Sequence, residues 1–197
     1  MFPSGSAMVI HHVAPVGAMN GLAIQVMSLS FISSYAADTL LTGELPSIDF
    51  LNKIKTELSI TTPVSTLLDS WTSLYEHAAK ELNTQLLDVI SDLKRTHRVY
   101  LLTDTLDTHH EFNERRGIYA RFDGVYASHI EGKSKSQGKA AFELFLKNYK
   151  LQAEHCVFID DMEAYVSLAI SLGLHAFVYT SNEQLVRDLK SIGINIK

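Results

Sequence analysis

The stretch Cys156–Tyr165, CVFIDDMEAY, joins a short apolar run to two adjacent carboxylates and then to a helical pattern. The apolar run predicts a buried strand, and Asp160 and Asp161 follow at its end. Two like charges about 4 Å apart repel each other by roughly 4 kcal/mol at an effective dielectric constant near 20. Something must offset this repulsion: water, a helix N-terminus, a lysine or a metal ion.

Strand-like and helix-like segments alternate on both sides of this stretch. The expected strands are residues 7–13, 98–103, 124–128, 156–160 and 175–180, and the expected helices among them are 107–116, 136–149, 163–174 and 181–189. This alternation predicts an α/β fold with right-handed crossovers, a parallel, Rossmann-like sheet and helices on both faces. Functional sites in such sheets form at the carboxyl ends of the strands.

A block of helical patterns separates the first expected strand from the others. Residues 21–37, 48–58, 61–82 and 84–95 have helical character, with Thr62 as the expected N-cap and Pro63 as the first residue of the third helix. The block up to about residue 80 has the features of a small helical cap inserted after the first strand. We therefore expect a core of residues 1–17 and 81–197 and a cap of residues 18–80.

Composition narrows the classes of function. A net charge of -5 argues against nucleic-acid binding. The single cysteine, Cys156, fits a reducing compartment and is expected to be a small buried hydrophobe. Residues 21–37 lack the positive segment of a signal peptide and are interrupted by Gln25 and serines, so we expect no membrane span and a cytoplasmic protein.

Three strand ends carry polar groups that suit one kind of chemistry. Thr103 ends one strand, Asp160 and Asp161 end another, and three lysines follow residues 124–128: Lys133, Lys135 and Lys139. A hydroxyl and an ammonium bind a phosphoryl group, and carboxylates suit Mg²⁺, which prefers oxygen ligands. Each feature alone has a plainer interpretation, such as helix capping by Asp160 or a solvated lysine loop. Together they predict a phosphate-plus-metal site.

The segments FDGVYASHIEGKSK, AAFELFLKNYKLQAEHCVFIDD and SLGLHAFVYTS resemble the second half of haloacid dehalogenase (HAD) superfamily hydrolases with a small helical cap. The resemblance implies that Thr103, Lys135, Asp160 and Asp161 are the catalytic residues of the later motifs, and that Thr103, Asp104 and Lys135 contact the substrate. It also implies Mg²⁺ bound by the acidic pair, with Asp161 as the favoured direct ligand. The spacing to Asp160 favours Lys135 as the motif lysine, with Lys133 and Lys139 as alternatives.

The first strand departs from the family pattern. Relatives carry Asp-x-Asp at its end, and the first Asp is the nucleophile, whereas this chain reads MVIHHVAPVGAMN and has no Asp before Asp38. By register, His12 stands at the nucleophile position and Ala14 at that of the second Asp. The favoured interpretation is a degenerate hydrolase, a pseudoenzyme of phosphatase or dehalogenase type that is weakly active or inactive. Its Mg²⁺ binding is then doubtful.

An active Mg²⁺-dependent phosphatase with an unplaced nucleophile is the alternative. The expected partner is a small phosphorylated ligand or a protein, and a homodimer is left open. With or without a metal, Lys135 should lie near Asp160 and Asp161 and offset their repulsion. A nearby ammonium would then depress the pKa of at least one of these carboxylates.

Overall fold

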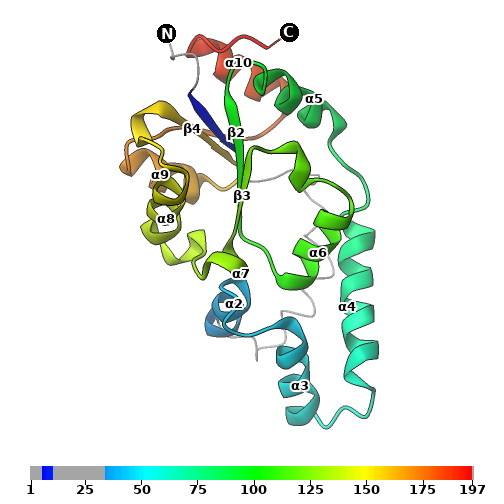
Figure 1. The fold of residues 1–197 in the computed structure, drawn as a ribbon. Helices are drawn as coiled ribbons and strands as arrows, with labels where there is room; N and C mark the ends of the chain where they lie inside the picture. The colour runs from blue at the N-terminus through cyan, green and yellow to red at the C-terminus, as the bar shows by residue number, and fades with distance from the viewer. Residues whose placement is uncertain (1–5, 11–33, 197) are drawn as a thin grey trace.

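The computed structural model describes residues 6–10 and 34–196, and its centre is a five-stranded parallel sheet (Figure 1). The strand order is β3-β2-β1-β4-β5. The strands are β1 (Ala7–Ile10), β2 (Arg98–Thr103), β3 (Gly124–Ala127), β4 (Cys156–Asp160) and β5 (His175–Val178). All five lie within the segments that the sequence predicts as strands. Residues 11–13, the rest of the first predicted strand, lie outside the described residues.

The register brings the carboxyl ends of three strands together. Ile10, the last residue of β1, is paired with Leu101 of β2 and with Ile159 of β4. Thr103 and Asp161 are therefore each two residues beyond the level of Ile10. Because β1 is the central strand, Ile10 lies in the middle of the sheet. Thr103 and Asp160 are the last residues of β2 and β4, the strands on either side of β1, and Asp161 follows β4.

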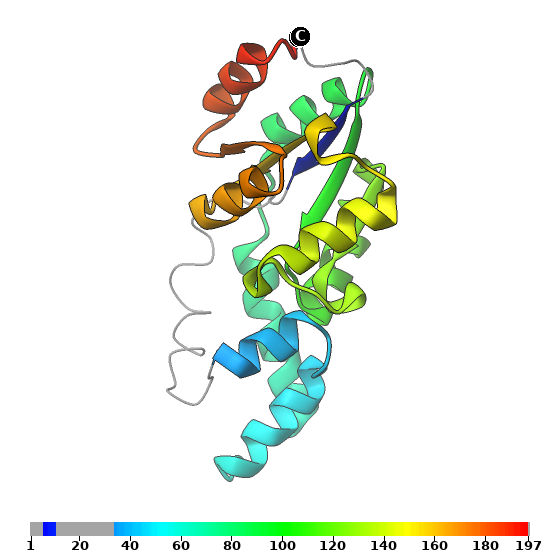
Figure 2. The ribbon, with the colours of Figure 1, turned by 90° about the vertical axis from the view of Figure 1, so that its left-hand side faces the viewer.

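Helices cover both faces of the sheet (Figures 1 and 2). On one face α5 (Thr84–Leu93) and α10 (Asn182–Ser191) pack against Met8, Ile10 and other alternate residues of the strands. On the opposite face α8 (Lys139–Tyr149) and α9 (Glu163–Ser171) pack against Val9 and Phe158. This alternation is the period of two that a strand imposes on its side chains. Cys156 is buried on this second face of the sheet, as predicted. Burial raises the pKa of its thiol to about 11.

Short helices lie in the connections before and after the strands. They are α6 (Asp107–Arg115), η1 (Tyr119–Arg121), α7 (Ser128–Glu131), η2 (Lys135–Gln137) and η3 (Ala153–His155).

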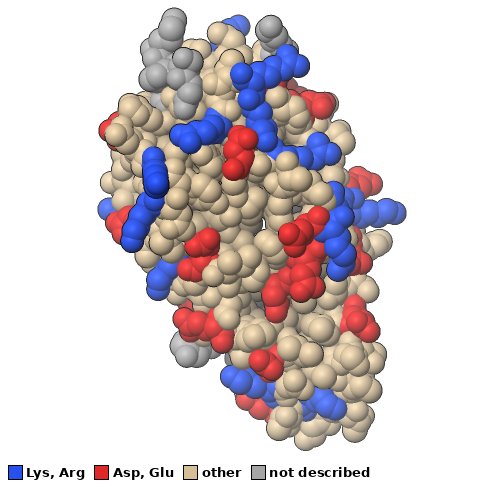
Figure 3. All heavy atoms as spheres, viewed as in Figure 1, with Lys and Arg blue, Asp and Glu red and all other residues tan. Residues whose placement is uncertain are grey.

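None of the helices in residues 34–196 is both long and apolar enough to cross a membrane. On the face seen in Figure 3, basic and acidic side chains are interspersed.

Three helices form a layer beyond the carboxyl edge of the sheet, where the cap is expected (Figure 1). They are α2 (Ser34–Leu41), α3 (Ser47–Glu57) and α4 (Val64–Ala78). Phe50 and Trp71 join α3 to α4, with ring centroids 5.8 Å apart, yet no residue of α4 is buried. Two paired helices enclose too little volume for a closed core. The boundaries of core and cap at residues 17 and 80 stay a prediction.

Two details of the cap helices differ from the sequence predictions. Pro63, not Thr62, is at the N-cap of α4, and no side chain caps this helix end. A helix was expected over residues 21–37, but α2 extends to Leu41; residues 21–33 lie outside the described residues. Apolar spacing indicates a helix more clearly than it indicates the residue where the helix begins or ends.

Replacing Gly43 with Ala should loosen the cap. Gly43 joins α2 to α3 with φ +72°, and a Cβ at this position would overlap the backbone carbonyl of His129 in α7. Gly132 is the matched control, because it has φ +73° and open space around it. We expect Gly132→Ala to lower the free energy of unfolding by about 1–2 kcal/mol, the cost of a left-handed backbone. Gly43→Ala should cost about 1–3 kcal/mol more, because the packed backbone must move. Equal costs in urea unfolding would contradict the close contact between cap and core.

Candidate functional site

One of the three candidate lysines enters the protein interior at the sheet edge. The Nζ atom of Lys135 lies 2.8 Å from Oδ2 of Asp160, and both side chains are 0% exposed. Lys133 and Lys139 are exposed. The structure therefore pairs Lys135, the lysine favoured by spacing, with the first of the two carboxylates.

The loop that carries Lys135 is fixed by its backbone. Ser134 and Gln137 form a capping box around η2, which holds the short helix in place. The carboxylate of Asp104, one residue after β2, accepts hydrogen bonds from the backbone N–H of Lys135 at 3.0 and 3.2 Å. Asp104 thus links the end of β2 to the lysine loop. Its expected contact with a substrate stays a prediction.

The ammonium of Lys135 is enclosed by groups of β4 and α9. Its Nζ lies 4.9 Å from the ring centroid of Tyr165 and 5.8 Å from that of Phe158. On the other side of the ion pair, Oδ1 of Asp160 accepts a hydrogen bond from the backbone N–H of Met162 at 2.8 Å. Both oxygens of Asp160 therefore have donors, and the ammonium has an acid and two aromatic rings around it.

Burial controls the titration of this pair. Burial raises the pKa of Asp160, and the ammonium of Lys135 opposes that rise only in part. Burial likewise lowers the pKa of Lys135, opposed by Asp160 and Asp104. The expectation of a depressed carboxylate pKa is wrong for Asp160. Lys135 has the predicted stabilising effect on the ionised form, but the loss of water around the carboxylate outweighs it.

Two further predicted site residues lie at the ends of the same strands. Thr103 is the last residue of β2 and is half-buried. Asp161 follows β4, is also half-buried, and its charge contributes to the electrostatics of Lys135. His12 and Ala14 lie outside the described residues. The structure therefore brings Asp104, Lys135 and Asp160 into direct contact, with Asp161 near them.

The cap reaches the same loop. Ser136, next to Lys135, donates a hydrogen bond of 2.9 Å to Oδ1 of Asp38 in α2. Asp38 is the first carboxylate of the chain, and its charge also acts on Asp104 and Tyr165. Sequence reasoning did not find this contact, because nothing in the spacing of residues 38 and 136 indicates that they meet.

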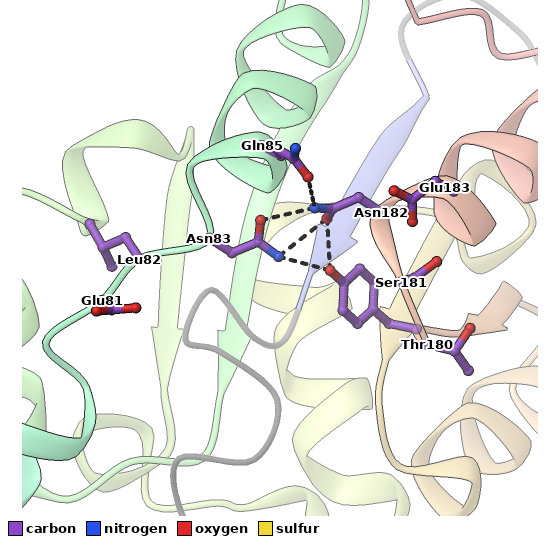
Figure 4. A pocket seen from close by; sticks show the side chains of 9 residues that line it. Glu81, Leu82, Asn83, Gln85, Thr180, Ser181, Asn182 and Glu183 are labelled. Atoms are coloured by element: carbon purple, nitrogen blue, oxygen red, sulfur yellow. Dashed lines mark hydrogen bonds between the residues drawn. The ribbon is translucent and has the colours of Figure 1, made fainter.

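A separate pocket of about 370 Å³ opens between the starts of α5 and α10 (Figure 4). Asn83 donates to the hydroxyl of Tyr179 at 2.9 Å, and Asn182 donates to Asn83 at 3.0 Å and to Gln85 at 2.9 Å. These side chains pair mainly with one another. Asn83 also caps α5 by accepting from Leu86 N–H at 3.0 Å. The network therefore anchors the segment that returns from the cap to the core. An Asn before an apolar helical run is a signal for such a cap.

The described residues at the sheet edge do not form a magnesium cage. Within residues 6–10 and 34–196, no group of three or more His, Cys, Asp or Glu side chains could hold a metal ion. Every Asp and Glu of the chain lies inside these ranges, so residues 11–33 add no carboxylate. Mg²⁺ demands near-ideal octahedral coordination by oxygen. Asp160, with a donor on each oxygen, is poorly placed to contribute to it.

No family model matches the chain, and no curated protein does. Solved structures do match. A predicted HAD-like family hydrolase from Porphyromonas gingivalis is 19% identical, with a TM-score of 0.75 over 96% of this chain and 98% of that one. A HAD family enzyme from Bacteroides thetaiotaomicron, solved as a magnesium complex, is 16% identical, with a TM-score of 0.73 over 95% and 98% of the two chains. The chain has the HAD fold.

Other HAD structures agree at lower similarity. The L-2-haloacid dehalogenase from Xanthobacter autotrophicus, with chloropropionic acid covalently bound, is 15% identical with a TM-score of 0.57, over 96% of this chain and 84% of that one. The predicted HAD-like parallel sheet is confirmed. Identities of 15–19% establish the shared HAD fold and leave the activity of this chain to be argued from its own residues.

Proposed function

We propose that this HAD-fold chain is a degenerate hydrolase of phosphatase or dehalogenase type, with weak or no activity, that acts by binding a ligand or a protein. One observation carries the proposal. The described part of the central strand β1 runs to Ile10, and the sequence continues with His11 and His12 and has no Asp or Glu before Asp38. In this proposal His12 occupies the nucleophile position and Ala14 that of the second acid.

The chemistry of the reaction makes that loss serious. Covalent catalysis of this type needs a carboxylate that accepts the phosphoryl or alkyl group from the substrate. In the family pattern, the same carboxylate is also a magnesium ligand. A histidine accepts a phosphoryl group in some enzymes, but it is a poor ligand for a hard cation. When the first strand has no acid, Asp160 serves mainly to pair with Lys135, and Asp161 adds its negative charge nearby.

An active phosphatase is the second candidate, favoured by the intact Lys135–Asp160 pair. It requires another carboxylate as the nucleophile. Asp38 is the first acid in the sequence, and its position beside the lysine loop makes it the one to consider. Asp38 belongs to α2 in the cap layer, however, and not to the end of β1. That position argues against an in-line role at the sheet edge.

Of the two classes of partner, the enclosed ammonium favours a protein. A phosphorylated ligand would have to reach a Lys135 side chain that is 0% exposed and already paired with Asp160. We therefore propose a protein partner ahead of a small phosphorylated ligand, with a second copy of this chain as one form of it. We also propose that the protein is cytoplasmic.

The test is a direct assay. With Mg²⁺ present, the wild-type chain should not hydrolyse p-nitrophenyl phosphate above the rate of a matched Asp161→Asn variant. Millimolar Mg²⁺ should also leave its Tm unchanged, because a ligand that does not bind the native state does not stabilise it. Robust turnover that is lost in Asp161→Asn would overturn the proposal and favour the active phosphatase.

A further inference from the structure

Three histidines lie where the cap meets the core, away from the Lys135–Asp160 pair. His109 and His110 are in α6, and His129 is in α7. The ring of His109 stacks on Tyr75 of the cap helix α4, with centroids 3.6 Å apart and planes 9° apart. The backbone carbonyl of His129 lies against Gly43 in the turn between α2 and α3. Both histidine-bearing helices therefore contact the cap directly.

The rings of two of these histidines lie side by side, and one nitrogen of each ring has no hydrogen-bond partner among the described residues. The ring centroids of His110 and His129 are 4.8 Å apart, and His110 also packs 4.6 Å from the ring of Tyr119. The Nδ1 atoms of His110 and His129 are buried and have no hydrogen-bond partner among the described residues. A protonated imidazole has two N–H donors. Protonation would therefore leave buried donors unpaired and place two positive charges side by side.

Negative groups near the pair are too few to offset that cost. Glu111 and Glu114 of α6 act on His110, and Asp107 acts on His129. The carboxylate of Asp107 already accepts hydrogen bonds from the backbone N–H of Ser47, at 3.0 Å, and from its hydroxyl. Burial outweighs these charges and lowers the pKa of both histidines.

The other ring groups at this junction stay neutral over the same pH range. Burial raises the pKa of Tyr75 in α4 and raises that of Tyr119 in η1 to about 12. Burial lowers the pKa of His109 to about 4, despite the charge of Asp107. While α4 lies on α6, the stacked His109 ring is therefore held in its neutral form, and its separation from Tyr75 would allow it to take up a proton.

We propose that His109, with His110 and His129 beside it, forms a proton-sensitive latch that holds the cap on the core at neutral pH and releases it in mild acid. Separation of α4 from α6 unstacks His109 from Tyr75 and gives its ring access to water. Release of the α2–α3 turn from α7 frees the helix that carries His129. The released form then binds protons near the ordinary histidine pKa of about 6.5, and the docked form binds them only at lower pH. Docking is therefore complete above this value and weakens as the pH falls through the range between the two pKa values. This inference is independent of the proposed function, since it involves neither His12 nor the ion pair.

Distances between spin labels measure the release. Lys53 in the cap helix α3 and Lys147 in the core helix α8 are exposed, so cysteines introduced at these positions accept labels, whereas Cys156 is buried. The variant is His109→Phe/His110→Phe/His129→Phe, which keeps a ring at each position and removes all three titrations. The matched control is His155→Phe, at an exposed histidine of η3.

In the labelled wild-type chain, the released fraction should grow by up to about tenfold per pH unit for each histidine between pH 6.5 and pH 5. His155→Phe should behave in the same way, and the triple variant should show no growth. Each single variant should show a reduced slope, which keeps the test valid if the triple variant does not fold. An unchanged label distance in folded wild-type protein at pH 5, or an equal response in the triple variant, would overturn the latch.

Discussion

Lys135→Met should lower the free energy of unfolding by about 3–5 kcal/mol at pH 7, the range found when one partner of a buried ion pair is removed. The substitution leaves the carboxylate of Asp160, which is fully buried, without its counter-ion. Met fills much of the volume of the lysine stem, so most of the loss comes from the unpaired charge. Urea unfolding of both proteins at pH 7 measures this difference.

The same variant should be less impaired at pH 4. Without the ammonium, the pKa of Asp160 in the folded state rises further above its unfolded value, because burial already raises it and Lys135 opposes the rise. A carboxyl group with a raised folded-state pKa destabilises the fold above that pKa, and the penalty disappears as the pH falls through it. Lys135→Met should therefore cost more stability at pH 7 than at pH 4. A cost that is equal at both pH values would show that the carboxylate is not the source.

A second substitution separates the charge from the packing. Lys135→Met combined with Asp160→Asn removes both charges and keeps an oxygen that accepts from the backbone N–H of Met162. We expect this double variant to recover most of the lost stability, since replacing both partners of a buried pair is often close to neutral. Lys139→Met, at an exposed lysine, is the matched control and should change stability by less than about 0.5 kcal/mol. A double variant as unstable as Lys135→Met would contradict the charge argument.

The sequence predicts the sheet well because its signals are local. Apolar runs such as residues 98–103 and 156–160 end in polar residues, and the helices between them fix a parallel order. The choice of Lys135 over its two neighbours also follows from spacing. Such arguments work when a feature depends on residues that are close together in the chain.

The features that sequence reasoning missed depend on contacts between distant segments. Tyr165 lies against Lys135, and Asp38 meets Ser136 across 98 residues. The direction of the Asp160 pKa shift was also wrong, because a sequence shows which charges are neighbours but not how completely water is excluded from them. At this site burial is complete, so it outweighs the attraction of the lysine.

Restoring the missing acids should restore magnesium binding. In the proposed register, His12→Asp combined with Ala14→Asp supplies carboxylates at the two sequence positions where the HAD motif has them. With Mg²⁺ at about 100 times its dissociation constant, binding would stabilise the variant by about 2.7 kcal/mol. For a chain of this size, that corresponds to a rise in Tm of about 5–10 °C. Thermal unfolding with and without Mg²⁺ measures the rise, and the wild-type chain should show none.

The control for this gain moves the acid by one residue. His11→Asp/Ala14→Asp carries the same charges but puts its first acid one position away from the proposed register, and neighbouring side chains on a strand point to opposite faces. A saturable Mg²⁺-dependent rise in His12→Asp/Ala14→Asp alone would support the proposed register. Equal rises in both variants would indicate non-specific binding to added charge. An equal rise in the wild-type chain would mean that its own residues hold the metal, so that the loss of the first acids had not abolished the site.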